Sequence, residues 1–297
     1  MTRKEGYASP AAFRRALTER LRARAMTGAS SLPELQRQFA YDRLLERLYR
    51  VNPDWILKGA AALLAREIGV RATIDIDVYR AVDSEVAERD LRTAAGLDLG
   101  DWFTFEIGPA RPLRAGATST RFHVTARVGT TAWAAHQIDL AGLDVRMTAH
   151  PDHVGPLVEV TMPNVDQGGY TAYPLVDHIA DKLAAILERH GEKAAPSTRF
   201  KDLVDLVAIV TRAEVPADLL ARAIGSEAEH RGLELTATFE VPDRQLWESG
   251  YAAEANRSRI NIGLTLDDAL AIVRPLVEPL LRGEAEGRWD PRHQRWL

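Results

Sequence analysis

Apolar side chains recur at helical spacing near the beginning of the chain. Residues 9–25 and 32–50 each predict an amphipathic helix, and Ser9 before a proline is a typical helix start. Asn52 also precedes a proline, and such a residue disfavours helical dihedral angles, so the second helix is predicted to end there. The chain therefore opens with a helical segment, residues 1–52.

A strand–helix–strand pattern follows. Ile56-Leu57 reads as a short strand, Gly59-Ala60 as a turn, and the next residues as an Ala/Leu-rich helix through about Ile68. The second strand then alternates, with three aliphatic residues expected to face the core: Ile74, Ile76 and Val78. Further patterns predict a helix at 83–95 and strands at 102–107, 122–128 and 132–140. We place this core at residues 53–165.

The pattern becomes helical after the loop 164–170. Helices are predicted at 176–189, 197–212, 215–231, 243–255 and 265–282, with Ser197 or Thr198 as the cap of the second. In the fourth, Trp247 and Tyr251 share an apolar side and are expected in the core. The predicted fold is α/β (α+β), with a mixed-sheet core (53–165), N-terminal helices (1–52) and a helical C-terminal lobe (166–297).

Composition narrows the class of protein. With 46% hydrophobic and 27% charged residues the chain is typical of a soluble globular protein. The absence of cysteine excludes disulfides and thiolate metal sites, and no secretory or membrane-spanning segment is visible, so we expect a cytoplasmic protein. The net charge of −4 does not indicate a nucleic-acid binder, but arginines gather at two places: Arg14, Arg15, Arg20, Arg22 and Arg24, and Arg288, Arg292 and Arg295.

Two carboxylates in the second strand are the first candidate for chemistry. Asp75 and Asp77 are two apart and so point to the same face of an extended strand. Adjacent carboxylates repel each other, and oxygen ligands of this kind suit Mg²⁺. The turn at Gly59-Ala60 offers backbone N–H groups where a helix begins, a position that favours anions such as phosphate.

These residues carry a family resemblance. The arrangement h-K-G-[GA]-x(n)-R-x-[ST]-x-D-h-D-h resembles the polymerase-β-type nucleotidyltransferase superfamily and, more narrowly, the AbiEii/MenT toxins of type IV toxin–antitoxin and abortive-infection systems. The resemblance implies two Mg²⁺ ions on Asp75, Asp77 and a third carboxylate on a later strand. We assign that third carboxylate to Asp139, with Asp144 as the alternative. It also implies binding of the nucleotide triphosphate by Lys58, Gly59, Ala60, Arg71 and Thr73.

Two later helices match further motifs of the same family. On the resemblance, Lys182 and Asp205 take catalytic roles and Asp202 a supporting, substrate-side role. Asp202 and Asp205 are three apart and share a helical face. The alternative is that Arg199–Asp202 and Lys201–Asp205 are ordinary surface ion pairs, which contribute under about 1 kcal/mol each.

The function implied by the resemblance is an NTP-dependent, pyrophosphate-releasing nucleotidyltransferase toxin. It would modify RNA, at the tRNA 3′ acceptor end in MenT-like members, and would be inhibited by a cognate antitoxin encoded nearby. Three alternatives stay open: modification of a protein hydroxyl, a DxD glycosyltransferase, and a degenerate nucleotide-binding module. The sequence contains no H-E-x-x-H, Walker A or G-x-S-x-G motif, so the corresponding hydrolase and NTPase classes are not indicated.

Overall fold

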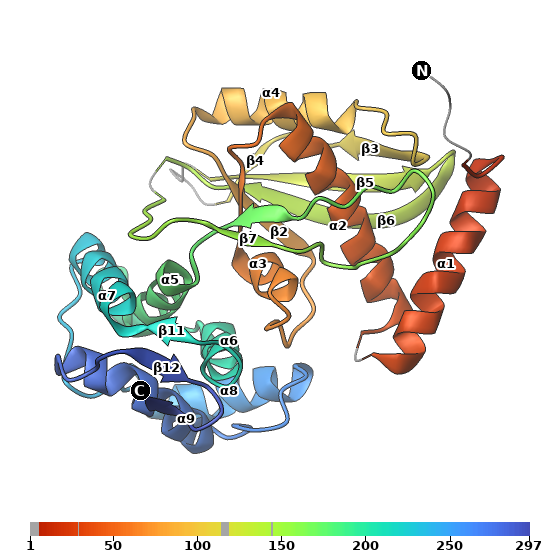
Figure 1. The fold of residues 1–297 in the computed structure, drawn as a ribbon. Coiled ribbons are helices and arrows are strands. Elements are labelled where there is room, and N and C mark those ends of the chain that lie inside the picture. The colour runs from red at the N-terminus through yellow and green to blue at the C-terminus, as the bar shows by residue number, and fades with distance from the viewer. Residues whose placement is uncertain (1–5, 29, 114–118, 144) are drawn as a thin grey trace. The chain divides into compact units, whose positions relative to one another are not determined.

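The computed structural model describes residues 6–28, 30–113, 119–143 and 145–297 (Figure 1). The chain forms two compact units. The first comprises residues 1–66, 73–145 and 153–172, and the second comprises residues 67–72, 146–152 and 173–297. Asp144, the alternative third carboxylate, lies outside the described residues. No helix of the described ranges is long and apolar enough to cross a membrane.

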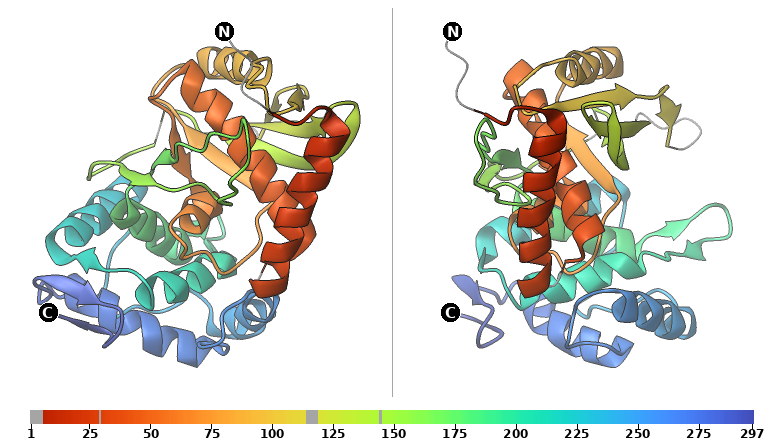
Figure 2. Two further views of the ribbon diagram at one scale, coloured as in Figure 1. Left: turned by 45° about the vertical axis from the view of Figure 1, so that its right-hand side comes forward. Right: turned by 90° about the vertical axis from the view of Figure 1, so that its right-hand side faces the viewer.

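Two helices open the first unit, as predicted. Helix α1 spans Pro10–Thr27 and helix α2 spans Leu32–Val51. The Ser9 hydroxyl accepts a hydrogen bond from the backbone N–H of Ala12 and so caps α1. The two helices pack side by side (Figure 2), and their leucine and phenylalanine side chains enter the same core as the sheet.

The first unit is built on a mixed sheet. Among the described residues it has eight strands, in the order β3-β5-β6-β2-β1-β8-β7 with β4 paired to β5. In the middle, β2 pairs antiparallel with β1 and parallel with β6, while β5 and β6 form an antiparallel hairpin. The strands are β1 Ile56–Lys58, β2 Asp75–Tyr79, β3 Phe103–Ile107, β4 Arg111–Pro112, β5 Thr120–Val128, β6 Thr131–Leu140, β7 Asp152–Val154 and β8 Tyr170–Ala172.

Helix α3 (Gly59–Ala65) follows β1, and helix α4 (Ser84–Ala95) follows β2. Two local predictions in this region are wrong. Helix α3 ends at Ala65 rather than near Ile68, because the chain turns and Glu67 takes a left-handed backbone conformation with φ of 59°. Ile74 is 53% exposed because it lies in a bend before β2 begins, whereas Ile76 and Val78 are fully buried as expected.

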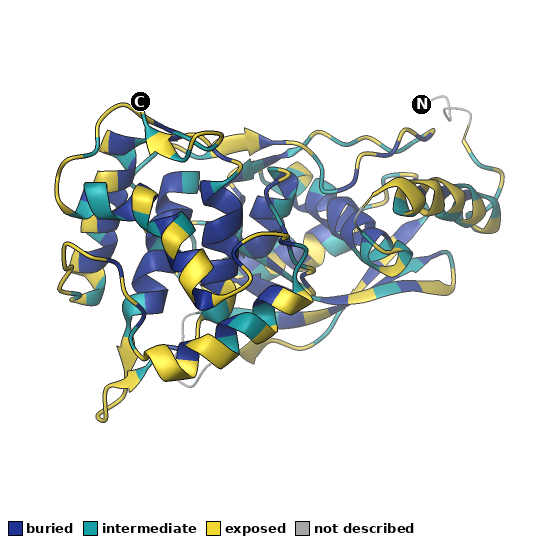
Figure 3. Cartoon of the chain, turned by 90° about the horizontal axis from the view of Figure 1, so that it is seen from below, coloured by how far each residue is buried: buried dark blue, intermediate teal, exposed yellow. Residues whose placement is uncertain are grey.

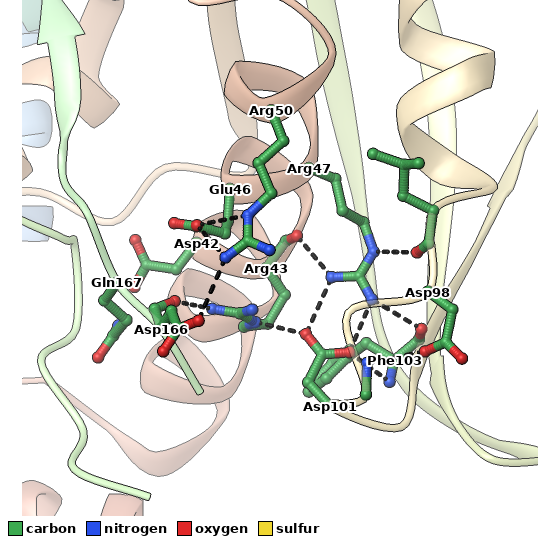
Figure 4. A network of polar contacts seen from close by, with 12 residues as sticks. Asp42, Arg43, Glu46, Arg47, Arg50, Asp98, Asp101, Phe103, Asp166 and Gln167 are labelled. Carbon is green, nitrogen blue, oxygen red and sulfur yellow. Dashed lines mark hydrogen bonds and ion pairs between the residues drawn. The ribbon is translucent and has the colours of Figure 1, made fainter. Parts of the chain in front are cut away.

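A network of buried charges fastens α2 to neighbouring loops (Figure 4). Arg47 and Arg43 contact the two oxygens of Asp101 at 2.6 and 2.7 Å, and all three side chains are buried. Burial acts to raise the pKa of Asp101, but Arg47 and Arg43 outweigh it and hold that pKa below its usual value. The network therefore fastens α2 to the loop that contains Asp101.

Asp42 makes a second connection from α2. It accepts hydrogen bonds from the backbone N–H groups of Leu157 and Val158 at 2.8 and 2.9 Å and from the Tyr170 hydroxyl. Burial raises the pKa of Asp42 to about 7, opposed by these hydrogen bonds. The long connection before β8 is therefore held against α2 by this carboxyl group and also by Arg43, which donates to the carbonyl of Asp166 at 2.6 Å.

The second unit is mainly helical, as predicted for the C-terminal part. Its helices are α5 Leu175–Leu187, α6 Phe200–Val210, α7 Ala217–Arg231, α8 Arg244–Arg257 and α9 Leu266–Leu281. Their buried faces meet in a common interior (Figure 3). Trp247 and Tyr251 are both fully buried, which confirms their expected place in the core. The cap of α6 is Arg199, not Ser197 or Thr198, because the Ser197 hydroxyl instead donates to the carbonyl of Ala185.

Short strands complete this unit: β9 Arg189–His190 with β10 Ala195–Pro196, and β11 Val215–Pro216 with β12 Arg288–Asp290 and β13 Arg295–Trp296. The C-terminal strands place Trp289 in the interior, where its indole N–H donates to the carbonyl of Val210 at 2.8 Å. Trp296 packs edge-on against it. The aromatic residues of the tail therefore pack within their own unit.

Candidate active site

Three carboxylates share one face of two neighbouring strands. Asp75 and Asp77 alternate on β2 with the buried Ile76. In the parallel register of β2 and β6, Asp77 lies beside Asp139 and Asp75 beside Gln137. Residues in register on adjacent strands point to the same side of a sheet, so the structure brings the three predicted metal ligands onto one face.

An arginine that the sequence analysis missed lies among these carboxylates. Arg121 on β5 faces Asp139 in the antiparallel register and donates to both of its oxygens, each at 2.7 Å. The same guanidinium is 3.7 Å from a carboxylate oxygen of Asp75. The hydrogen bond to Asp139 is the main reason that the pKa of Arg121 is raised above its usual value, so this side chain is a permanent cation.

The donor set fits a hard divalent cation. Carboxylate oxygens are the ligands that Mg²⁺ prefers, and three of them lie on adjacent positions of one face. Within the ranges that the structure describes, no three acidic or histidine side chains are already arranged as a metal site. Asp139 is turned to Arg121 instead, with both carboxylate oxygens accepting from the guanidinium.

Gly59 lies close to Asp77 on β2, the strand with the pair Asp75 and Asp77, which we call the DxD strand. Lys58 lies opposite Asp77 in the β1–β2 register, and Gly59, the next residue, has a φ of 62°. A Cβ atom at position 59 would lie 1.8 Å from Oδ2 of Asp77. Only glycine therefore combines this left-handed conformation with this close approach.

We expect Gly59→Ala to displace the Asp77 carboxylate and to lower both stability and nucleotidyl transfer. Left-handed backbone costs an L-residue about 1–2 kcal/mol in any position, and the contact with Asp77 adds to that. Gly100→Ala is the matched control, because Gly100 has a φ of 71° but no heavy atom within 4 Å of the added Cβ. Thermal unfolding and transfer rates of both variants separate strain from displacement. Equal losses of stability with full transfer in both would contradict the assignment.

A second group of predicted residues meets within the helical unit. Lys182 on α5 contacts Asp202 and Asp205 on α6, at 2.9 and 2.7 Å from Nζ. Arg71 donates to both oxygens of Asp205, at 2.9 and 3.0 Å, and Arg199 contacts Asp202 at 2.5 Å. The two aspartates thus face the same side of α6, and we call these five residues the Lys182 cluster.

Burial gives the Lys182 cluster its electrostatic character. Lys182, Asp202 and Asp205 are at most 5% exposed. Burial lowers the pKa of Lys182, but Asp202 and Asp205 outweigh it and raise that pKa above its usual value. Burial likewise raises the pKa of Asp205, yet Lys182 and Arg71 hold it below its usual value. Of the two ion pairs in the alternative, Arg199–Asp202 is present, with an exposed arginine. Its description as an ordinary surface pair does not fit, because Asp202 is buried and shares the buried Lys182 with Asp205.

The remaining residues that were predicted to bind the triphosphate have the following surroundings in the structure. Arg71 is paired with Asp205. The Thr73 hydroxyl is hydrogen-bonded to the backbone of Asp75, donating to its carbonyl at 3.0 Å and accepting from its N–H at 3.2 Å. Ala60 is 7% exposed at the start of α3. The roles of Lys58, Ala60, Arg71 and Thr73 toward a triphosphate stay predictions.

An arginine-lined groove lies along α1. It has a volume of about 420 Å³ and is formed by one side of α1 and the β5–β6 turn. Among the residues that the structure describes, Arg14, Arg15 and Arg22 line it together with the hydroxyls of Thr18, Thr130 and Thr131 and one acid, Glu19. We call it the α1 groove. A groove at the C-terminal strands is mixed in charge, because Glu214 and Asp290 line it beside Arg288 and Arg292.

Comparison with known proteins now identifies the family. The sequence model described as "Nucleotidyl transferase AbiEii toxin, Type IV TA system" matches residues 43–284. No curated protein sequence matches the chain. The fold is similar to the MenT4 nucleotidyltransferase toxin from Mycobacterium tuberculosis H37Rv, with 15% identity, a TM-score of 0.57 and 89% of each chain covered. It is also similar to JHP933 from Helicobacter pylori, with 13% identity, a TM-score of 0.51, and 84% of this chain and 93% of that chain covered.

At such identities the two structures show a shared fold, and they confirm the predicted fold class. The family match covers more than half of the chain and confirms the predicted resemblance, and with it the nucleotidyltransferase class over a glycosyltransferase. The chain therefore belongs to the AbiEii family of nucleotidyl transferase toxins of type IV toxin–antitoxin systems.

Proposed function

We propose that this toxin transfers a nucleotide from an NTP to RNA, at the 3′ acceptor end of tRNA, and thereby inhibits growth until its cognate antitoxin neutralises it. The observation that carries the proposal is the placement of Asp75, Asp77 and Asp139 on one face of β2 and β6, with Gly59 closing on Asp77. NTPs and tRNA are cytoplasmic, and we place the reaction there.

Asp75, Asp77 and Asp139 would hold two Mg²⁺ ions. When bound, such ions lower the pKa of the attacking hydroxyl and stabilise the leaving pyrophosphate. The carboxylates orient the reacting groups, and the Gly59 and Ala60 amides with Lys58, Arg71 and Thr73 bind the triphosphate. Transfer joins the acceptor 3′ oxygen to the α-phosphorus of the NTP and breaks the bond from that phosphorus to the oxygen that bridges to the β-phosphorus. Pyrophosphate leaves, and the proton of the acceptor hydroxyl passes to solvent. The protein takes no covalent part in the transfer, so its contribution to the rate comes from positioning the reactants and from electrostatic stabilisation.

Lys182 supplies positive charge for the phosphates in this proposal, and Asp205 with Asp202 fixes its ammonium group. The support is the Lys182 cluster itself, in which two buried carboxylates hold the lysine and Arg71 and Arg199 hold the carboxylates. A lysine kept charged and in one position by such contacts is preorganised for electrostatic stabilisation.

The direct experiment incubates the protein with each α-³²P-labelled NTP, Mg²⁺, and either total RNA or total protein. We expect label in RNA of tRNA length, resistant to proteinase and removed by RNase. Asp77→Asn, which is expected to lose nucleotidyl transfer, serves as the negative control. Label that remains with polypeptide after RNase treatment would favour the alternative, modification of a protein hydroxyl.

The α1 groove supports RNA as the acceptor. Three arginines and three hydroxyls in one groove match the sugar–phosphate backbone, whose contacts depend on charge more than on sequence. The sequence analysis grouped Arg20, Arg22 and Arg24 with Arg14 and Arg15. The structure distinguishes them, because Arg22 lines the groove, whereas Arg20 donates to the carbonyl of Ala16 and Arg24 to that of Glu159.

We therefore expect Arg15→Gln/Arg22→Gln to weaken RNA labelling about tenfold and to flatten its salt dependence. For single-stranded RNA each lost phosphate contact lowers the slope of log K against log salt by about 0.7. Arg20→Gln/Arg24→Gln is the matched control, with the same loss of charge on the same helix. Electrophoretic binding assays at several salt concentrations measure the slopes, and NTP binding should be unchanged in both variants. Equal slopes for the two double variants would remove the groove from the proposal.

A further inference from the structure

Arg121 occupies a position that the catalytic proposal leaves unexplained. Its guanidinium extends from β5 and binds both oxygens of Asp139 on β6, and it also lies 3.7 Å from Asp75 on β2. It therefore contacts two of the three carboxylates to which we assign the metal. A side-by-side pair of N–H···O bonds of this kind is strong and fixes the orientation of the carboxylate.

Two other sets of ion pairs in the first unit, which have structural or surface positions, provide a comparison for Arg121. Arg43 and Arg47 are fully buried with Asp101 and fasten a loop. Arg127, on the same strand as Arg121, contacts Glu106 on β3 at 2.7 Å, with side-chain exposures of 35% and 63%. Arg121 has a similar exposure, 31%, but its partner Asp139 is only 8% exposed and belongs to the carboxylate face.

We propose that Arg121 is a positioning residue that holds Asp139 away from the divalent cation in the nucleotide-free toxin, so that cation and guanidinium compete for the same carboxylate. The inference rests on the proposed function for the identity of the metal ligands. Two consequences follow. A cation bound at Asp75 and Asp77 is repelled by the neighbouring guanidinium, and Asp139 joins the ligand set only when Arg121 leaves it.

An incoming triphosphate is the anion suited to draw Arg121 away. Guanidinium groups bind phosphate through the same two-pronged geometry that they use for carboxylates. The partial exposure of Arg121 gives the side chain room to turn toward solvent while Asp139 stays in the sheet. Metal binding and nucleotide binding are thereby coupled through one side chain. The nucleotide-free toxin therefore binds its cations weakly.

The test measures Mn²⁺ binding to the full-length protein by electron paramagnetic resonance of the free ion, with no nucleotide present. Arg121→Gln should bind Mn²⁺ at least about tenfold more tightly than the wild type, because a neighbouring positive charge disfavours a second cation. General damage to the fold would weaken binding, so a gain in affinity distinguishes this role from a merely structural one. Arg127→Gln is the control and should bind Mn²⁺ like the wild type.

Further variants test whether Arg121 affects Mn²⁺ affinity through its contact with Asp139. In an Asp139→Asn background, adding Arg121→Gln should increase Mn²⁺ affinity much less, because the contested ligand is gone. Arg121→Lys keeps the charge but cannot bond both carboxylate oxygens, and it should shift the affinity in the same direction by a smaller factor. That variant also serves if Arg121→Gln does not fold.

The outcomes separate the two proposals. Mn²⁺ binding that is lost in Asp77→Asn but is unchanged or weaker in Arg121→Gln and Arg121→Lys would overturn the role of Arg121 alone. Mn²⁺ binding that Asp77→Asn does not affect would remove the metal site itself, and with it the proposed function.

Discussion

Asp77→Asn is expected to reduce nucleotidyl transfer by a factor of about 10³ or more while the protein remains folded, because loss of preorganised charge at a reacting phosphate has effects of this order. Asp77 lies at the centre of the candidate site, opposite Lys58 on one side and Asp139 on the other. The substitution keeps the shape of the side chain and removes one anionic metal ligand. Label transfer from an NTP under single-turnover conditions measures the loss, and circular dichroism measures the fold.

Glu106→Gln is the matched control for Asp77→Asn. It removes a carboxylate from the same sheet, and Glu106 is paired only at the surface, with 63% of its side chain exposed. Its transfer rate should stay near that of the wild type. If Asp77→Asn were folded and kept a substantial part of the wild-type rate with Mg²⁺, the DxD strand would not be the catalytic strand.

Lys182→Met is expected to lower the free energy of unfolding by about 3 kcal/mol, the lower end of the range for breaking a buried ion pair. The lysine is 5% exposed and is shared by two buried aspartates, which would lose their common partner. Arg71 and Arg199 still pair with those aspartates, and this keeps the loss from being larger. Chemical denaturation measures the change.

The catalytic role of Lys182 predicts a separate effect on rate. Transfer by folded Lys182→Met should fall about 10²–10³-fold at a temperature well below its unfolding transition. Lys201→Met is the control, because Lys201 is exposed on the same helix as Asp202 and Asp205. A large loss of stability with an unchanged rate would leave the Lys182 cluster a structural role only.

The pH dependence gives the same cluster a further check. Its aspartates have pKa values below the usual range, with burial opposed by Lys182 and the neighbouring arginines. The stability they contribute is therefore present above the pKa of an unfolded aspartate, about 3.9, and is lost as the pH falls through their folded values. The difference in stability between wild type and Lys182→Met should narrow as the pH falls below about 4.

Local periodicity accounts for what could be predicted from the sequence. The helices α1 and α2, the DxD strand and the helices α5 to α9 follow from spacings of apolar residues within a few turns or a few alternations. The exceptions include the end of α3 at Ala65, where the helix was predicted to continue to about Ile68, and the exposed Ile74, which was predicted to face the core. The common face of Asp75 and Asp77 needs nothing more than the period of an extended strand.

Contacts between residues that are far apart in the sequence could not be predicted from local periodicity. Arg71 and Asp205 are 134 positions apart, and only the packing of the helical unit brings them together. The Lys182 cluster was predicted as a set of roles, but its burial was not, since an i,i+3 pair on one helix is equally compatible with a solvated surface.

Arg121 shows most directly what the tertiary structure decided. Counting back from the β5–β6 turn, where Val128 pairs with Thr131, would place Arg121 opposite the buried Ile138. A β-bulge shifts the register by one residue, because Arg127 pairs with Ala132 but Ala126 pairs with Ala134. The extra residue, Trp133, is buried, and its indole N–H donates to the carbonyl of Gln36 on α2 at 2.8 Å.

The sequence by itself thus determined which carboxylates share a strand face, because side-chain alternation is a property of each strand alone. Which cation meets them depended on the bulge at Trp133. A one-residue change of register exchanges the two faces of a strand, and here the packing of one indole against a distant helix selects the register that places Arg121 beside Asp139.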